Sequence, residues 1–286
     1  MNRFSKEEVR LVRRMRYELF PTTNVSSIIK YLPKNSNVSV TSSVKHGVKE
    51  TQAMTQQLLA ADHSVCPHFA ARLVSGAHET KQLALWTRTN GIKKVFIVAG
   101  DCNETNYYTD SLQFMEDFLN EDHGVECVSF AIYPDGHPLV DHAELVSFAL
   151  RKNKLISERG LRSEAVSQMC FDGSRIVDYV QLLRSNDFTS SVYVGIPGII
   201  SYFKLFSIGT SLGVSNSLRF LHKNANAASM LLSPKPYDPS ALISQIAQAN
   251  EVLGNEGSAG AGIEGVHVFT FNALETTVSW AAQYSK

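Results

Sequence analysis

Short runs of β-branched and aromatic residues alternate along the chain with longer segments in which apolar residues recur at helical spacing. The short runs predict strands, and the longer segments predict helices. Several runs are continuously apolar over most of their length, such as residues 95–100 of the run 93–100, as expected for a parallel strand that is covered on both faces. The predicted strands are residues 15–20, 37–41, 64–71, 93–100, 126–134, 164–171, 191–198 and 265–272.

Helical segments separate most of these strands, and the alternation predicts one (β/α)8 TIM barrel over residues 1–286, a single domain with extra helices toward the carboxyl terminus. A doubly wound open sheet is the alternative, but that fold usually has a glycine-rich turn after its first strand, and the segment ELFPTTN has no glycine. Residues 212–238 are long for one barrel connection and predict an additional short helix. The glycine-rich residues 254–265 open no helix, so they predict a flexible connection rather than a nucleotide loop. The predicted helices are residues 47–60, 76–90, 108–120, 142–158, 173–186, 201–211, 238–254 and 274–284.

The composition is that of a globular protein, because 44% of the 286 residues are hydrophobic and only 19% are charged. The 27 basic residues balance the 27 acidic residues, so nucleic acid and membrane surfaces are not expected as partners. No apolar run reaches the roughly 18 residues that a membrane span needs, and the amino terminus has no apolar signal core. We therefore expect a cytoplasmic protein whose four cysteines, which form no CxxC pair, are reduced and buried.

The active site of a barrel of this kind lies at the carboxyl ends of its strands, so polar residues at those positions are the candidates for chemistry. Glu18 lies between Tyr17 and Leu19 in an apolar strand, which makes it a candidate general acid. The alternative for Glu18 is an ion pair with an arginine such as Arg16. Asp101 follows a strand that ends in a small Ala-Gly pair, which a ligand can approach closely; the alternative for Asp101 is a turn or helix-cap role.

Further polar groups follow the other strands. His68 and His137 lack the HxH or HExxH spacing of a metal site, and hydrogen bonding to a cofactor is the favoured reading, so we predict no metal. The Gln168 amide either forms hydrogen bonds with a ligand or takes part in a hydrogen-bond network within the core. The chain also lacks GxSxG, P-loop and GxGxxG motifs. The residues alone therefore indicate a barrel enzyme that uses acid and amide chemistry on a polar, planar ligand.

Eight segments in order, YELFP, NVSVT, CPHF, GIKKVFIVAGD, IYPDGHP, SQMCFD, GIPGI and VFTFN, make the chain resemble the methylenetetrahydrofolate reductase family. Bacterial members of that family are single FAD-binding barrels, and the resemblance covers about residues 15–282. It implies an oxidoreductase of one-carbon metabolism that interconverts 5,10-methylenetetrahydrofolate and 5-methyltetrahydrofolate, with NADH as electron donor. It also implies that tetrahydrofolate derivatives are the partners and that the protein forms homo-oligomers.

The resemblance assigns roles to individual residues. Glu18 matches the family's general acid, which protonates the folate as its five-membered ring opens, and Asp101 matches an aspartate beside the flavin and the pterin. Gln168 matches a glutamine that hydrogen-bonds the pterin, and Phe203, or else Tyr202, matches a phenylalanine that packs on the aminobenzoyl ring. The residues carried over for FAD are Thr41, His68, Gly100, Asp101, Thr109, Tyr133, His137, Ser147 and Lys152.

The chain departs from the family pattern at two arginines, where it has Ala99 and Ala273. The first departure removes an expected contact to the flavin, and the second removes an expected anchor for the glutamate tail of the folate. Two alternatives follow for the function. One is a divergent branch that oxidises 5-methyltetrahydrofolate in methyl-group catabolism with an acceptor other than NAD. The other is a folate-binding barrel without redox activity.

Overall fold

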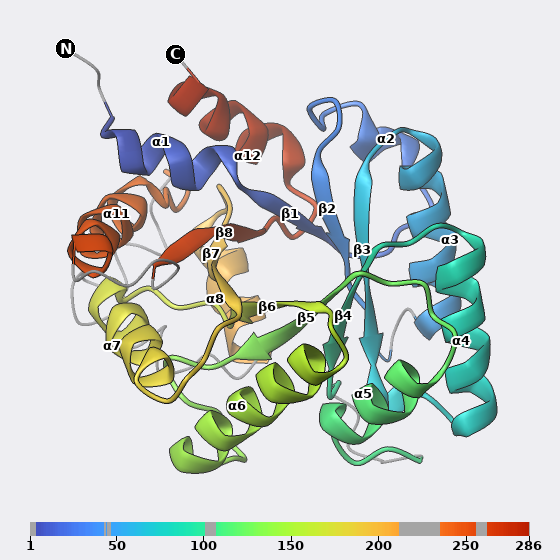
Figure 1. Cartoon of the computed structure of the whole chain (residues 1–286). Coiled ribbons are helices and arrows are strands. Elements are labelled where there is room, and N and C mark those ends of the chain that lie inside the picture. The colour runs from blue at the N-terminus through green and yellow to red at the C-terminus, as the bar shows by residue number, and fades with distance from the viewer. Residues whose placement is uncertain are drawn as a thin grey trace. The chain divides into compact units, whose positions relative to one another are not determined.

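The computed structural model of the chain contains eight parallel strands that form a closed barrel in the order β1 to β8 (Figure 1). It describes residues 4–42, 44, 47–100, 107–211, 235–255 and 262–285. The (β/α)8 TIM barrel predicted from the sequence pattern is confirmed. The strands are β1 (Arg16–Leu19), β2 (Asn37–Val40), β3 (Ser64–Ala70), β4 (Lys94–Val98), β5 (Cys127–Ile132), β6 (Arg162–Ser167), β7 (Ser191–Pro197) and β8 (Ile263–Phe269).

The predicted strands and helices match the structure closely in the middle of the chain and less closely at its ends. Strands β6 and β8 each begin two residues earlier than predicted, because β6 opens with the polar Arg162 and Ser163 and, in β8, Glu264 and Gly265 separate Ile263 from the apolar run. The extra helix predicted within residues 212–238 falls mostly outside the described residues. The main helices are α3 (Gly47–Ala60), α4 (Ala77–Thr89), α5 (Ser111–Asn120), α6 (His142–Glu158), α7 (Gly173–Arg184), α8 (Tyr202–Ser211), α11 (Ser240–Asn255) and α12 (Leu274–Ala281).

Two helices before the second strand were not predicted, α1 (Lys6–Arg13) and the short α2 (Ser26–Ile29). Helix α1 begins with a capping box, in which the Ser5 hydroxyl accepts a hydrogen bond from Glu8 N and the Glu8 carboxylate accepts one from Ser5 N. This arrangement satisfies two of the amide groups that a helix start leaves without partners. The pattern Ser-x-x-Glu was therefore a readable helix signal in the sequence.

The chain divides into two compact units. The first unit consists of Arg16–Ala131 and Arg151–Glu164, and the second consists of Met1–Met15, Ile132–Leu150 and Ala165–Lys286. The prediction of a single domain stays a prediction. No helix within the described ranges is long and apolar enough to cross a membrane.

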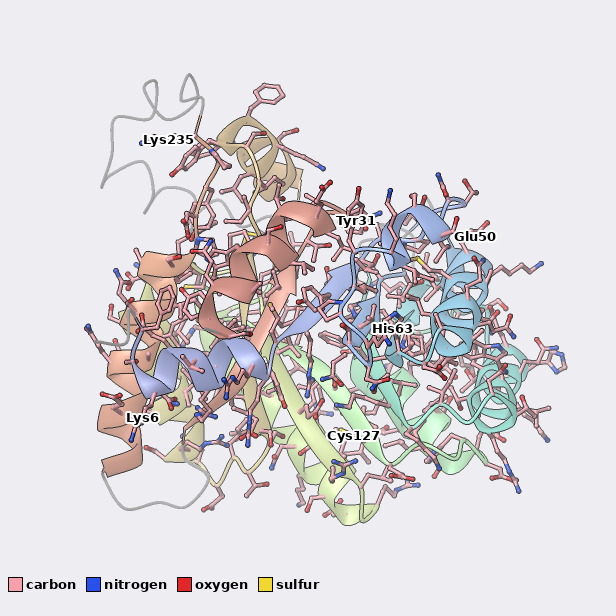
Figure 2. All side chains as sticks on the ribbon, turned by 90° about the horizontal axis from the view of Figure 1, so that it is seen from above. Lys6, Tyr31, Glu50, His63, Cys127 and Lys235 are labelled. Atoms are coloured by element: carbon pink, nitrogen blue, oxygen red, sulfur yellow. The ribbon has the colours of Figure 1, made fainter. Side chains whose placement is uncertain are left out.

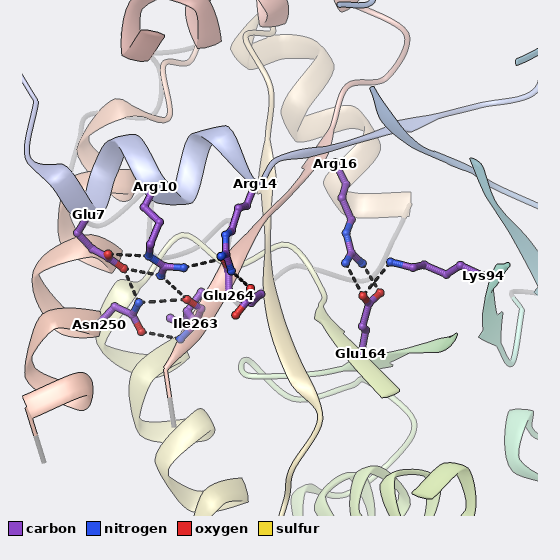
Figure 3. Close-up of polar contacts among 9 residues, drawn as sticks. All are labelled: Glu7, Arg10, Arg14, Arg16, Lys94, Glu164, Asn250, Ile263 and Glu264. Atoms are coloured by element: carbon purple, nitrogen blue, oxygen red, sulfur yellow. Dashed lines mark hydrogen bonds and ion pairs between the residues drawn. The ribbon is translucent and has the colours of Figure 1, made fainter. Parts of the chain in front are cut away.

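The first unit contains a buried ionic cluster at the amino ends of its strands (Figure 3). Arg16 donates two hydrogen bonds to the Glu164 carboxylate, at 2.6 and 2.7 Å, and Lys94 Nζ donates a third at 2.8 Å. The Ser129 hydroxyl donates a fourth at 3.0 Å. Burial by itself raises the pKa of Glu164, but the hydrogen bonds and charges of Arg16 and Lys94 outweigh it and bring the pKa to about 2. The Glu164 carboxylate is therefore ionised, and both of its oxygens accept hydrogen bonds.

In the second unit, helix α1 packs on β8, on α11 and on the short helix η2 (Ala282–Ser285) (Figure 1). Arg10 donates to the carbonyl oxygens of Ile263 and Glu264, at 2.6 and 3.0 Å, and also forms an ion pair with Glu7 (Figure 3). Asn250 of α11 donates to the Ile263 carbonyl oxygen at 3.1 Å and accepts from Ile263 N. These bonds fasten the amino-terminal helix to the last strand.

Candidate functional site

Three buried polar side chains meet in the first unit near the carboxyl ends of β1, β2 and β3. Glu18, Ser39 and His68 are exposed by only 8%, 2% and 5%. His68 Nε2 lies 2.5 Å from Ser39 Oγ and 3.9 Å from Glu18 Oε2. The ring of Phe96 packs beside the imidazole, with the two centroids 4.3 Å apart. We call Glu18, Ser39 and His68 the acid cluster.

Strand register produces the acid cluster. Glu18 of β1 pairs with Ser39 of β2, and Ser39 pairs with Cys66 of β3, two residues before His68. Residues two apart on a strand project from the same face, so Cys66 and His68 lie on the same side. The sequence predicted Glu18 and His68 separately; it did not predict Ser39, because the contact depends on pairing between strands far apart in the chain.

Two hydroxyl groups that follow β2 are buried without a hydrogen-bond partner. Among the residues that the structure describes, the Thr41 and Ser42 oxygens have no such partner, and Thr41 is only 9% exposed. A buried polar group left without a partner costs about 1–3 kcal/mol. A bound molecule with hydrogen-bonding groups would remove that cost, and the place of Thr41 at a ligand site stays a prediction.

Gly100 follows β4 and, having no side chain, presents only backbone atoms to its surroundings. Its φ angle is +91°, and a Cβ atom there would lie 3.0 Å from Ala70 Cβ. Arg72, which the sequence analysis missed, donates to the Thr109 carbonyl oxygen at 2.9 Å and to the Gly100 carbonyl oxygen at 3.4 Å. Arg72 thereby holds Gly100 and Thr109, which lie on the two sides of the connection after β4. Asp101, predicted beside Gly100, lies outside the described residues.

The two remaining residues predicted for the cofactor in the first unit are placed differently. Thr109 is exposed, and its hydroxyl donates to Gln113 at 2.9 Å. Lys152 of α6 is buried, with its ammonium 5.8 Å from the centroid of the Phe130 ring. Burial lowers the pKa of Lys152 to about 8, against the opposing charge of Asp110. The ammonium therefore lies within the protein interior rather than on an open surface.

In the second unit, Tyr133 and His137 come together after β5. Their ring centroids are 5.3 Å apart, and His137 Nδ1 accepts a hydrogen bond from Leu139 N at 3.2 Å. Asp135, between them in the chain, forms an ion pair with Arg175 at 3.3 Å. Burial raises the pKa of Asp135, while Cys170 and Arg175 act to lower it. This ion pair ties the loop that carries His137 to helix α7.

The predicted substrate residues also lie in the second unit. The Gln168 side-chain oxygen accepts a hydrogen bond from Met169 N at 2.8 Å, so its NH₂ group is the part that can serve a ligand. Phe203 is 74% exposed on α8. Tyr202, the alternative to Phe203, is half-buried and packs edge-on against Tyr237 at 6.0 Å. Ser147, predicted for the cofactor, is exposed on α6.

The loop after β8 has an unusual backbone. Phe271 and Asn272 have φ angles of 50° and 61°, a left-handed conformation that non-glycine residues adopt at a cost. Lys204 of α8 donates to the Phe271 carbonyl oxygen at 3.1 Å. The Lys204 ammonium group therefore lies beside the loop that ends in Ala273. Ala273 is the position at which the family resemblance leads one to expect an arginine.

The described cysteines, Cys66, Cys127 and Cys170, are free and buried, as predicted, while Cys102 lies outside the described residues. Cys127 is labelled in Figure 2. Burial raises the pKa of Cys66 to about 12 and that of Cys127 to about 11, so both thiols stay protonated. Among the residues that the structure describes, no three His, Cys, Asp or Glu side chains are grouped to hold a metal ion.

No family model matches the chain. It is similar to the solved structure of a GH20 β-N-acetylhexosaminidase from Streptomyces coelicolor A3(2), with a TM-score of 0.35 and 9% identity over 65% of this chain and 48% of that one. The chain thus spans about half the length of that protein. A glycoside hydrolase family 20 β-N-acetylglucosaminidase gives a TM-score of 0.44 and 10% identity, over 96% of this chain and 69% of that one. We draw no functional conclusion from either likeness.

Proposed function

We propose that this protein is a flavin-dependent oxidoreductase that interconverts 5,10-methylenetetrahydrofolate and 5-methyltetrahydrofolate, with NADH as the electron donor. One observation supports the proposal most directly. The carboxyl group of Glu18, singled out from the sequence as a general acid, is buried near the carboxyl end of β1 with His68 Nε2 at 3.9 Å. Active sites of TIM barrels form at that end of the strands.

In this proposal Glu18 donates a proton to the folate nitrogen that leaves as the five-membered ring opens. General acid catalysis requires a carboxyl group held in one place and protected from bulk water. The burial of Glu18 and its neighbour His68 meets both requirements. In the opposite direction the same carboxylate takes the proton back as the ring closes.

The residues of the first unit fit a flavin in part. The unpartnered Thr41 hydroxyl, the imidazole of His68 and the bare backbone at Gly100 are groups that would hold a polar, planar cofactor. When bound, FAD supplies the hydride chemistry, which no side chain of the protein can perform. Lys152 is buried against Phe130 and would contribute to flavin binding at most through its positive charge.

The residues of the second unit suit the folate. The Gln168 NH₂ group is a donor of the kind that a pterin ring requires, and the exposed ring of Phe203 offers an apolar surface to an aromatic partner. The role of Asp101 beside the flavin and pterin remains part of this proposal.

An anaerobic absorbance titration tests the proposed function. The purified protein is reconstituted with FAD, and NADH or 5-methyltetrahydrofolate is added in separate titrations. The absorbance of the flavin band at about 450 nm is followed in each. We expect both compounds to bleach the flavin. Bleaching by 5-methyltetrahydrofolate alone would favour the branch with an acceptor other than NAD, whereas bleaching by neither would refute the flavoenzyme proposal.

A further inference from the structure

The hydrogen bonds of Ser39 determine which nitrogen of His68 has the proton. A serine hydroxyl has one hydrogen to donate, and a carbonyl oxygen can only accept. Ser39 Oγ donates to the Cys66 carbonyl oxygen at 3.2 Å. When the hydroxyl hydrogen is used in this way, the hydroxyl oxygen is the acceptor in the 2.5 Å contact with His68 Nε2, and the hydrogen of that contact belongs to the imidazole nitrogen.

We infer that Ser39 is a positioning residue that holds the neutral imidazole of His68 in the Nε2–H form. The contact is well protected, because Ser39 is 2% exposed and His68 is 5% exposed. The Phe96 ring beside the imidazole restricts its rotation, and the Cys66 carbonyl oxygen fixes the direction of the serine hydrogen. Neither the sequence pattern nor the family resemblance assigns a role to Ser39.

The consequence for Glu18 rests on the proposed function. The imidazole nitrogen near the carboxyl group is Nε2, at 3.9 Å from Oε2. A nitrogen that already bears a hydrogen cannot accept a second proton in the plane of the ring. In this form Nε2 does not act as a base toward the Glu18 carboxyl group, whose proton goes to the folate in the proposed reaction. Without Ser39, the imidazole could take the opposite form and present an unprotonated Nε2 to the acid.

Nitrogen NMR of the histidine side chains tests the assignment without requiring catalysis. The full chain is labelled with ¹⁵N-histidine, and long-range ¹H–¹⁵N spectra are recorded near neutral pH; the nine histidines are resolved by comparison with His68→Asn. We expect the Nε2 shift of His68 to be that of a protonated nitrogen and the Nδ1 shift to be that of an unprotonated one. Ser39→Ala should move both shifts toward a mixture, and Ser39→Thr, which keeps the hydroxyl, should restore them.

Two outcomes would overturn the assignment. One is a His68 ring protonated on Nδ1 in the unaltered protein, and the other is a Ser39→Ala spectrum with unchanged His68 shifts. The Ser39→Ala change removes a single oxygen atom, and circular dichroism of each variant establishes that it is folded.

Rapid kinetics tests the consequence for Glu18. General acids contribute about 100-fold to 10,000-fold to a rate, so partial loss of the proton should be measurable. We expect Ser39→Ala to slow the folate half-reaction at least about tenfold more than it slows flavin reduction by NADH, and Ser39→Thr to reverse this difference. Equal slowing of both half-reactions would refute the effect on Glu18. Failure to react with any folate would refute the proposed function, and the tautomer would still be decided by NMR.

Discussion

Replacing Glu164 by glutamine should strongly destabilise the protein, because it removes the counterion of two cations in the first unit. The Glu164 side chain is 9% exposed and accepts hydrogen bonds from Arg16, Lys94 and Ser129 at 2.6–3.0 Å. Its pKa lies at about 2, compared with a reference value of 4.5. Since a tenfold change in proton affinity equals about 1.4 kcal/mol, the folded state gains about 3 kcal/mol from the ionised carboxylate. Breaking buried ion pairs costs about 3–5 kcal/mol, which agrees with this figure.

The sign of the pH dependence follows from the lowered pKa. The stabilisation is fully present above the unfolded-state pKa of Glu164 and is lost as the pH falls toward the folded-state pKa of about 2. The difference in unfolding free energy between Glu164→Gln and the unaltered protein should therefore be constant between about pH 6 and 8 and should shrink below about pH 5.

Urea denaturation followed by circular dichroism measures this difference at each pH. Glu158→Gln is the matched control, because Glu158 is 61% exposed and lies 3.8 Å from Lys154; its loss should change stability by less than about 1 kcal/mol. A loss below about 1 kcal/mol for Glu164→Gln at pH 7, or a difference that persists unchanged down to pH 3, would refute this reasoning.

Further predictions concern the site, the buried lysine and the amino-terminal helix. Glu18→Gln should keep flavin reduction by NADH while slowing the folate half-reaction at least about 100-fold in stopped-flow measurements, and normal folate turnover would exclude Glu18 as the acid. Phe203→Ala should raise the KM for folate with little change in melting temperature, because its side chain is 74% exposed; an unchanged KM would remove Phe203 from the site. Lys152→Met should stabilise the flavin-free protein at pH 7, because burial lowers the pKa of Lys152 to about 8, and the stabilisation in urea should disappear above about pH 10 as the unfolded chain loses the same proton. Arg10→Ala should lower the unfolding free energy by about 1–3 kcal/mol in the same assay, since it removes bonds to two backbone carbonyl groups.

The barrel could be predicted from the sequence because each strand and helix has a local signature. Helices α3 and α6 were predicted with the bounds that the structure shows. Helix α1 was missed because charged residues occur throughout residues 6–13 and interrupt its apolar positions, although Ser5 and Glu8 form a cap signature. The predicted and observed elements differ at the starts of β6 and β8, where polar residues or glycine interrupt the apolar run.

The candidate site could be predicted only in part. Glu18 was recognisable as a carboxylate within an apolar strand, and its burial is confirmed. The Ser39–His68 contact and the Arg16–Glu164 pair were not predicted, because they join residues 29 and 148 positions apart in the chain. Such contacts depend on strand register and barrel closure, which a single sequence does not encode in any local pattern.

The bonds between α1 and the last strand have a consequence for the order of folding during synthesis. Arg10 and Glu264 are separated by 254 positions, so the ribosome must reach Glu264 before the partner of this helix exists. Contacts of such long sequence separation form slowly, because the loop between them must be closed first. The residues of the first unit, which end at Glu164, emerge well before Ile263. Helix α1 should therefore remain open to proteases and chaperones until β8 has been synthesised, and shortened chains that end before β8 should keep it exposed.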